Sequence, residues 1–217
     1  MKYFGHIDNQ GEPFDKKLDT FFEQKEDGFF IELGANDGLE QSNTAFLEFH
    51  RGWTGLLIEP SPEAFAKCIL NRPGSICKNV ACVSSDFKDS FVTGDFDGGM
   101  MSSIEGKRTG KSTRINVNAK PLEQLLQEIH PKEIDFMSLD VEGEELNVLQ
   151  GMNLQVYRPH YILIEIYKDK YNSIMSFMDE HQYECIENFS NYNKTDNPIW
   201  DGLTNDYLFQ DTLWKPT

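Results

Sequence analysis

The sequence has 217 residues, with 36 Asp and Glu against 20 Lys and Arg, so its formal net charge is −16. A surface this acidic repels phosphate backbones and anionic lipid headgroups, which argues against nucleic-acid and membrane partners. The sequence contains no apolar run of about 20 residues that would span a bilayer. Its first residues lack the pattern of a signal peptide, and its four cysteines form no CxxC pair. We therefore expect a cytoplasmic protein with reduced thiols.

The length suits a single α/β domain over residues 1–217. We expect residues 1–27 to be a polar lead-in with one amphipathic helix, and residues 28–217 to form the core. Apolar runs predict strands at 29–33, 55–59, 76–84, 134–139 and 161–166, with closing strands at 183–188 and 206–210. Strands that alternate with helices in this way predict a doubly wound sheet.

Helices are expected between these strands. The run Ser61-Pro62-Glu63 is typical of a helix start, with a hydroxyl N-cap, proline at the first position and an acid at the positive end of the dipole. Other helices are predicted at 44–49, from 121, from 142 to 151, and at 173–180. Residues 84–119 interrupt the alternation. We expect a β-hairpin and loop insertion there, with 90–93 pairing against 76–84.

Two strands that end in an acid indicate a cofactor site. A dinucleotide fold needs G-x-G-x-x-G after the first strand, but Asn36 stands where the middle glycine should be, so a pyrophosphate would meet a side chain. We therefore expect S-adenosylmethionine, with its methionine end on the first loop and its ribose hydroxyls on Glu59. The predicted cofactor-binding residues are Glu32, Gly34, Ala35, Asn36, Asp37, Gly38, Glu59, Pro60 and Ser84.

The segment from Ile134 to Leu146, with Asp140-Val141-Glu142-Gly143 at its centre, resembles the strand-four signature of FkbM-type methyltransferases. The similarity covers most of residues 28–170, although Lys120-Pro121-Leu122 stands where the family often has Leu-Asp. The resemblance implies a Rossmann-like class I fold with a seven-stranded mixed sheet. It also implies dependence on S-adenosylmethionine. Most members of this family transfer the methyl group to hydroxyl oxygens of sugars and secondary metabolites, so the resemblance implies O-methyl transfer.

Transfer to a hydroxyl needs alignment and a group that takes the proton. Asp140, at the end of strand 134–139, is the first candidate for this base or for orienting the acceptor, and Glu165 is the second. Asp140, Glu142 and Glu165 are also candidate ligands for Mg²⁺ or Mn²⁺, while Glu142 has the alternative role of capping the next helix. The acceptor pocket is expected to include Ser102, Ser103, Tyr167, Lys168 and Trp200.

Several functions fit this sequence. The main hypothesis is O-methyl transfer to a hydroxyl of a sugar or glycan, and the alternatives are a natural-product hydroxyl or a non-catalytic S-adenosylmethionine-binding module in a glycan-assembly protein. Asn36 argues against a nicotinamide oxidoreductase. Residues 106–112 resemble a P-loop, but Glu105 occupies the position of its first glycine. Both a solvated basic hairpin and a positive patch for an anionic acceptor remain open for that segment.

Overall fold

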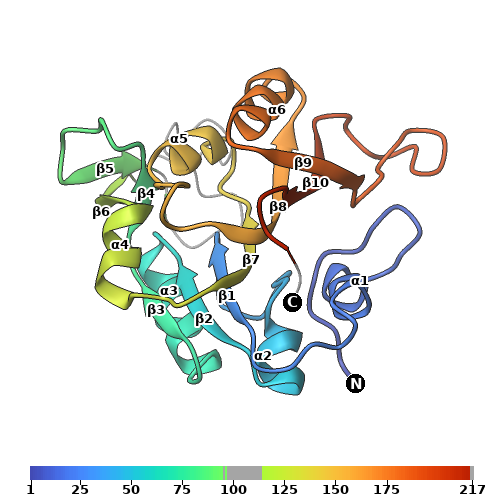
Figure 1. The fold of residues 1–217 in the computed structure, drawn as a ribbon, viewed down its shortest axis with the longest axis horizontal. Coiled ribbons are helices and arrows are strands. Elements are labelled where there is room, and N and C mark those ends of the chain that lie inside the picture. The colour runs from blue at the N-terminus through green and yellow to red at the C-terminus, as the bar shows by residue number, and fades with distance from the viewer. Residues whose placement is uncertain (95, 97–113, 216–217) are drawn as a thin grey trace.

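The computed structural model describes residues 1–94, 96 and 114–215. Its central sheet has seven strands in the order β3-β2-β1-β7-β8-β10-β9 (Figure 1). The first five in this order are parallel to one another, whereas β10 is antiparallel to both of its neighbours. The strands are β1 (Phe29–Leu33), β2 (Thr54–Ile58), β3 (Ile76–Lys78), β7 (Ile134–Leu139), β8 (Pro159–Tyr167), β9 (Tyr183–Asn188) and β10 (Thr204–Asp211). The predicted Rossmann-like α/β fold with a seven-stranded mixed sheet is confirmed.

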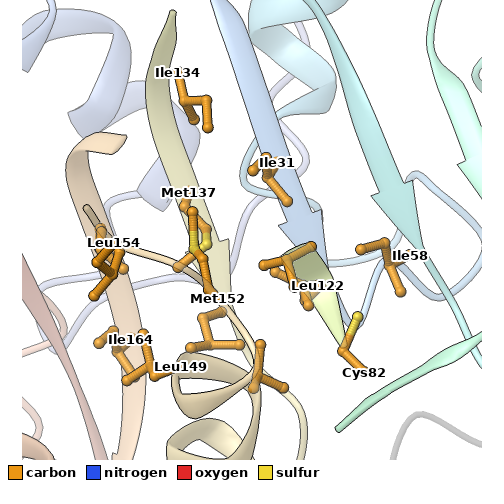
Figure 2. Packing of buried hydrophobic residues seen from close by; sticks show 14 of the residues in the cluster. Ile31, Ile58, Cys82, Leu122, Ile134, Met137, Leu149, Met152, Leu154 and Ile164 are labelled. Atoms are coloured by element: carbon orange, nitrogen blue, oxygen red, sulfur yellow. The ribbon is translucent and has the colours of Figure 1, made fainter. Parts of the chain in front are cut away.

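Successive side chains of the strands enter two hydrophobic cores, one on each face of the sheet. On β8, Ile162 and Ile164 pack with the helices α4 (Leu122–Ile129), α5 (Glu145–Gln150) and α6 (Tyr171–Glu180). Leu163 packs on the opposite face with α1 (Phe14–Phe21), α2 (Ala45–Arg51) and α3 (Pro62–Asn71). Figure 2 shows the first core, where residues of β1, β7 and β8 meet residues of the helices that cover them. Covering both faces leaves the strand ends as the place for polar chemistry.

The predicted helix start at Ser61 is confirmed, since its hydroxyl accepts a hydrogen bond from the backbone N–H of Ala64 at 3.4 Å. The helix predicted from 142 instead begins at Glu145. Glu142 and Gly143 have φ angles of 58° and 101°, and this left-handed backbone cannot belong to a right-handed helix. The residues between β7 and α5 therefore form a loop.

The strand predicted over 76–84 is wrong, because the structure divides this segment into two strands. β3 lies in the central sheet, and β4 (Ala81–Val83) lies in a second sheet of three strands. Between them, Nδ2 of Asn79 donates hydrogen bonds to the carbonyl oxygens of Glu59 and Pro60, both at 2.8 Å. These two bonds hold the chain against the end of β2, so the strand cannot continue along the central sheet.

The insertion predicted over residues 84–119 contributes to a small separate sheet and does not form a hairpin with the strand predicted over 76–84. β5 (Phe91–Gly94) pairs antiparallel with β6 (Ile115–Pro121), and β4 pairs parallel with the other edge of β6. The expected pairing of 90–93 with 76–84 is therefore wrong. The small sheet has its own hydrophobic cluster, formed by Ala81, Val83, Val92, Phe96, Val117 and Ala119.

The lead-in contains the expected amphipathic helix, α1, whose Phe14 and Leu18 are fully buried. Upstream of α1, Gly5 forms a parallel bridge with Gln41, which lies in the segment between β1 and α2. The lead-in thus reaches the carboxyl end of the central sheet. Within the part of the chain that the structure describes, none of the helices has the length and apolar character needed to cross a bilayer.

Candidate active site

A pocket lies at the carboxyl ends of β1, β2 and β7. Its lining comes largely from the loops that follow these three strands, and includes Gly34, Asn36, Glu59, Pro60, Asp140 and Glu142. The hollow holds about 860 Å³ of empty space, part of which is open to solvent. The structure therefore brings six of the predicted site residues to one place, at the edge where open α/β sheets bind ligands.

Glu59 is held rigidly in this pocket. Its Oε2 accepts a hydrogen bond from the backbone N–H of Asn36 at 2.8 Å, and its Oε1 accepts one from the N–H of Ser61 at 2.7 Å. The side chain is buried, and burial raises its pKa to about 7, while the two N–H groups act in the opposite direction. A carboxylate has about four acceptor positions, so a ligand can still use the other lone pairs.

The turn that follows β1, from Gly34 to Gly38, packs directly against the loop after β7. Gly34 has a φ of +80°, and a Cβ at this position would lie 1.9 Å from the carbonyl oxygen of Asp140. Glycine is therefore required here for the two loops to touch. Asn36 tolerates its own φ of 48°, and its N–H is already donated to Glu59. That N–H is thus unavailable to a phosphate, which supports a cofactor without pyrophosphate.

Glu32 does not line the pocket, and this predicted cofactor contact needs correction. Its carboxylate is buried behind the turn, where it accepts hydrogen bonds from the hydroxyls of Ser42 and Thr44 and from the N–H of Asn43. Nη1 of Arg72, which is fully buried, lies 3.5 Å from the same carboxylate. The charge of Glu32 is therefore used to hold the segment before α2.

Three other predicted contacts shape the turn without lining the pocket. Asp37 accepts two backbone N–H groups within its own turn. The carbonyl of Gly38 accepts a hydrogen bond from Arg72 at 3.0 Å, and Ala35 is buried in the core. Within the turn after β1, Gly34 and Asn36 thus line the pocket, whereas the other three residues fix the shape of the turn.

Ser84 is also outside the pocket, because the division of the third strand moves it away. Its hydroxyl donates to Asp86 at 2.6 Å, and it borders a different hollow beside Gln150 and His181. One wall of the cofactor pocket is instead built by the residues around β4, namely Val80, Ala81, Cys82 and Phe96.

The loop after β7 is braced from two sides. Glu145 is fully buried, and its Oε1 accepts hydrogen bonds from the N–H groups of Val141 at 3.2 Å and Gly143 at 2.9 Å. Glu142 accepts a hydrogen bond from the hydroxyl of Tyr167 at 2.9 Å. Tyr167, a predicted acceptor residue, thus contacts a residue of the pocket lining. These contacts fix the loop that carries Asp140.

Acidic side chains form a row across the same edge of the sheet. Glu165 on β8 lies directly opposite Asp206 on β10, and the row continues to Asp140, since Leu139 pairs with Ile164 one position earlier. Burial, and then the charges of Asp140 and Asp206, raise the pKa of Glu165 well above its ordinary value. Among the described residues, however, no group of three acids, histidines or cysteines is arranged to hold a metal ion. The predicted metal set of Asp140, Glu142 and Glu165 is thus not supported.

Comparison with known proteins identifies the family. The profile of the methyltransferase FkbM domain matches residues 32–185, which is more than half of the chain and includes all three strand ends of the pocket. The chain belongs to the FkbM methyltransferase family. Membership makes it an S-adenosylmethionine-dependent methyltransferase. No curated protein sequence matches the chain significantly.

Solved structures resemble this FkbM methyltransferase only at the level of the fold. A fibrillarin of Aeropyrum pernix with natively bound S-adenosyl-L-methionine aligns with a TM-score of 0.51 at 11% identity, over 85% of this chain and 67% of that chain. A TehB-like S-adenosylmethionine-dependent methyltransferase of Corynebacterium glutamicum aligns with a TM-score of 0.49 at 8% identity, over 92% and 87% of the two chains. The likeness to fibrillarin supports the class I fold.

Two of the predicted acceptor residues of this FkbM methyltransferase lie around hollows next to the acidic row. Lys168 and Trp200 border one of them, while Trp200 also borders the second, together with Glu165 and Asp206. Ser102 and Ser103 lie outside the described residues, as does the P-loop-like segment 106–112.

Reasoning from the sequence missed several residues of the site, among them Asp206, which lies opposite Glu165. His6 borders the hollow that contains Glu165, and Gln41 lines the cofactor pocket. The bridge between Gly5 and Gln41 brings the lead-in to this edge. A polar segment without periodicity carries no local signal of such a contact, because only the tertiary fold creates it.

The buried carboxyl of Glu145 predicts a pH-dependent stability. Burial raises its pKa from 4.5 to about 7, so between these values the folded state binds more protons than the unfolded state and stability falls as the pH rises. The Glu145→Gln variant resembles the protonated form. Going from pH 5.5 to pH 8, the free energy of unfolding of the wild type should fall by on the order of 1–3 kcal/mol more than that of the variant. Urea unfolding at both pH values measures the difference, and equal slopes would contradict this placement.

Proposed function

We propose that this chain is an O-methyltransferase that uses S-adenosylmethionine and acts on a hydroxyl group of a sugar or glycan. Family membership supports methyl transfer, and a fibrillarin with the same fold carries S-adenosylmethionine natively. The observation that carries the proposal is the carboxylate of Glu59, which two backbone N–H groups hold at the sheet edge where open α/β sheets bind their ligands.

The residues of the pocket fit this cofactor. Glu59 would accept the two ribose hydroxyls on the lone pairs that its backbone contacts leave unused. The wall around β4, with Val80 to Cys82, would border the base, and the turn at Gly34 and Asn36 would face the methionine end. When bound, S-adenosylmethionine supplies a methyl group on a sulfonium, which is an excellent leaving group.

The remaining work of catalysis is positioning and proton removal. Well-oriented reactants gain on the order of 7–11 kcal/mol from alignment, so the braced loop of Asp140 is itself part of the mechanism. Asp140 lines the cofactor pocket and begins the acidic row, so its carboxylate stands where it can orient a hydroxyl and take its proton. Glu165 is the second candidate. Burial and the neighbouring acids raise the pKa of Glu165, so its charged form is costly in the ligand-free protein, which favours Asp140 as the base.

A sugar is supported by the residues beside the acidic row. Trp200 and Tyr192 border the hollow that contains Glu165 and Asp206. Aromatic rings stack on the apolar faces of sugars, and carboxylates accept hydrogen bonds from their hydroxyls. A flat natural-product acceptor would use the aromatic rings but would leave the acids without donors, so the acids favour a polyhydroxylated acceptor.

The test is release of S-adenosylhomocysteine in the presence of a panel of monosaccharides and a panel of phenolic and macrocyclic alcohols. We expect turnover with at least one sugar and none in its absence. Calorimetry with S-adenosylhomocysteine and with NADH should show binding of the first alone. Tight binding without turnover on either panel would instead identify a non-catalytic module, and turnover restricted to the second panel would reassign the acceptor.

A further inference from the structure

The row of acids contains a pair whose arrangement is unfavourable in the ligand-free protein. Glu165 and Asp206 are directly opposed in the antiparallel ladder of β8 and β10, so their side chains are on the same face of the sheet. Like charges in directly opposed positions destabilise a sheet. Asp140 adds a third carboxylate at the next strand, because it follows Leu139, which pairs with Ile164 directly before Glu165.

Two buried polar atoms at this pair lack hydrogen-bond partners, and one is an acceptor while the other is a donor. Among the described residues, Oε2 of Glu165 has no hydrogen-bond donor and Nε1 of Trp200 has no acceptor. Both side chains border the same hollow, together with His6, Tyr192 and Asp206. An unpaired buried polar atom costs free energy comparable to a lost hydrogen bond. A ligand in this hollow that offers a donor next to an acceptor would complement these two side chains.

We propose that the acceptor carries a protonated amine next to a hydroxyl, as in an amino sugar, and that Glu165 and Asp206 hold the ammonium group beside Trp200. This inference rests on the proposed function and narrows its substrate class. The ammonium would donate to Glu165 and neutralise the opposed carboxylates, while an adjacent hydroxyl oxygen would accept from the indole N–H. The rings of Trp200 and Tyr192 add a surface that attracts organic cations.

An organic ammonium explains these residues better than a metal ion does. No group of three ligating side chains in the described part of the chain is arranged around a metal position. Aromatic rings also do not ligate hydrated Mg²⁺ or Mn²⁺, which require oxygen donors. The net charge of −16 adds a long-range field that draws cations toward the protein.

The experiment compares glucosamine, galactosamine and mannosamine with the parent sugars and the N-acetyl forms, near neutral pH and with saturating S-adenosylmethionine. N-acetylation removes the charge but keeps the ring and its hydroxyls. We expect kcat/KM for at least one amine to exceed that of both neutral partners by tenfold or more. Asp206→Asn should remove most of this preference by raising KM. Glu184→Gln, which removes an exposed acid on β9, should keep it.

A second measurement does not depend on the choice of sugar. Without ligand at pH 8, Asp206→Asn and Glu165→Gln should each melt at a higher temperature than the wild type. Each replaces one of two directly opposed acids whose pKa values are raised in the fold, and so removes the cost of placing that acid there. Lower melting of both variants, equal turnover of neutral and amino sugars, or no response to any amine in turnover and thermal shift would overturn the inference. So would stabilisation by Mg²⁺ that Asp206→Asn abolishes. If the wild type fails to bind S-adenosylhomocysteine, the proposed function itself is wrong.

Discussion

The Asp140→Asn variant should lose turnover by about a hundredfold to ten-thousandfold, the range expected when a general base is removed. Asparagine has the same shape and keeps the backbone carbonyl that packs against Gly34, so the two loops should still meet. Its neutral amide cannot take a proton from the acceptor. The measurement is single-turnover methyl transfer with saturating acceptor, together with the affinity for S-adenosylhomocysteine.

The control for this prediction is cofactor binding. Asp140→Asn should leave the Kd for S-adenosylhomocysteine within about threefold of the wild type, a difference below 1 kcal/mol. Glu184→Gln, which removes an exposed acid on β9, should keep most of the activity. Full activity of Asp140→Asn would exclude Asp140 from proton transfer.

The Glu59→Ala variant should bind the cofactor about tenfold to a hundredfold more weakly, because charge-assisted hydrogen bonds contribute roughly 1.5–3 kcal/mol. The substitution removes the acceptor for the ribose hydroxyls. It also releases the N–H groups of Asn36 and Ser61, which the carboxylate now fixes. Calorimetry with S-adenosylhomocysteine measures the loss, and an unchanged Kd would show that the ribose lies elsewhere.

The same carboxylate predicts how affinity varies with pH in the wild type. Burial raises the pKa of Glu59 to about 7, so below this pH its protonated form loses acceptor capacity and the cofactor should bind more weakly at pH 6 than at pH 8. The Glu59→Ala variant should lose this dependence. Glu63→Gln, an exposed position on α3, should behave like the wild type. A pH profile that persists in Glu59→Ala would assign the titration to another group.

Most of the fold could be predicted because local patterns and tertiary structure agree in it. The buried strands read as apolar runs, and the start of α3 is encoded by Ser61 and Pro62. The errors have long-range or conformational causes. The segment 76–84 is apolar on both sides of Lys78 and Asn79, and the hydrogen bonds of Asn79 to the end of β2 divide it there. The left-handed backbone of Glu142 likewise cannot be read from a glutamate.

Site residues could be predicted from the sequence where their position at the end of a strand alone decides whether they line the pocket. Gly34, Glu59 and Asp140 follow three neighbouring parallel strands, so topology alone brings them together. Residues whose side chains turn away were not predictable, and Glu32 shows why. Its role depends on Ser42, Asn43 and Thr44, which the fold places against it.

The wall formed around β4 gives the pocket a modular construction. Gly34, Glu59 and Asp140 follow strands of the central sheet, whereas Ala81 and Phe96 belong to the separate hydrophobic cluster of the small sheet. Substitutions in that cluster can therefore reshape one side of the pocket without disturbing the strands that carry Asp140 and Glu165. Engineering of the enzyme for synthetic cofactor analogues with altered bases should therefore begin with the residues of this wall.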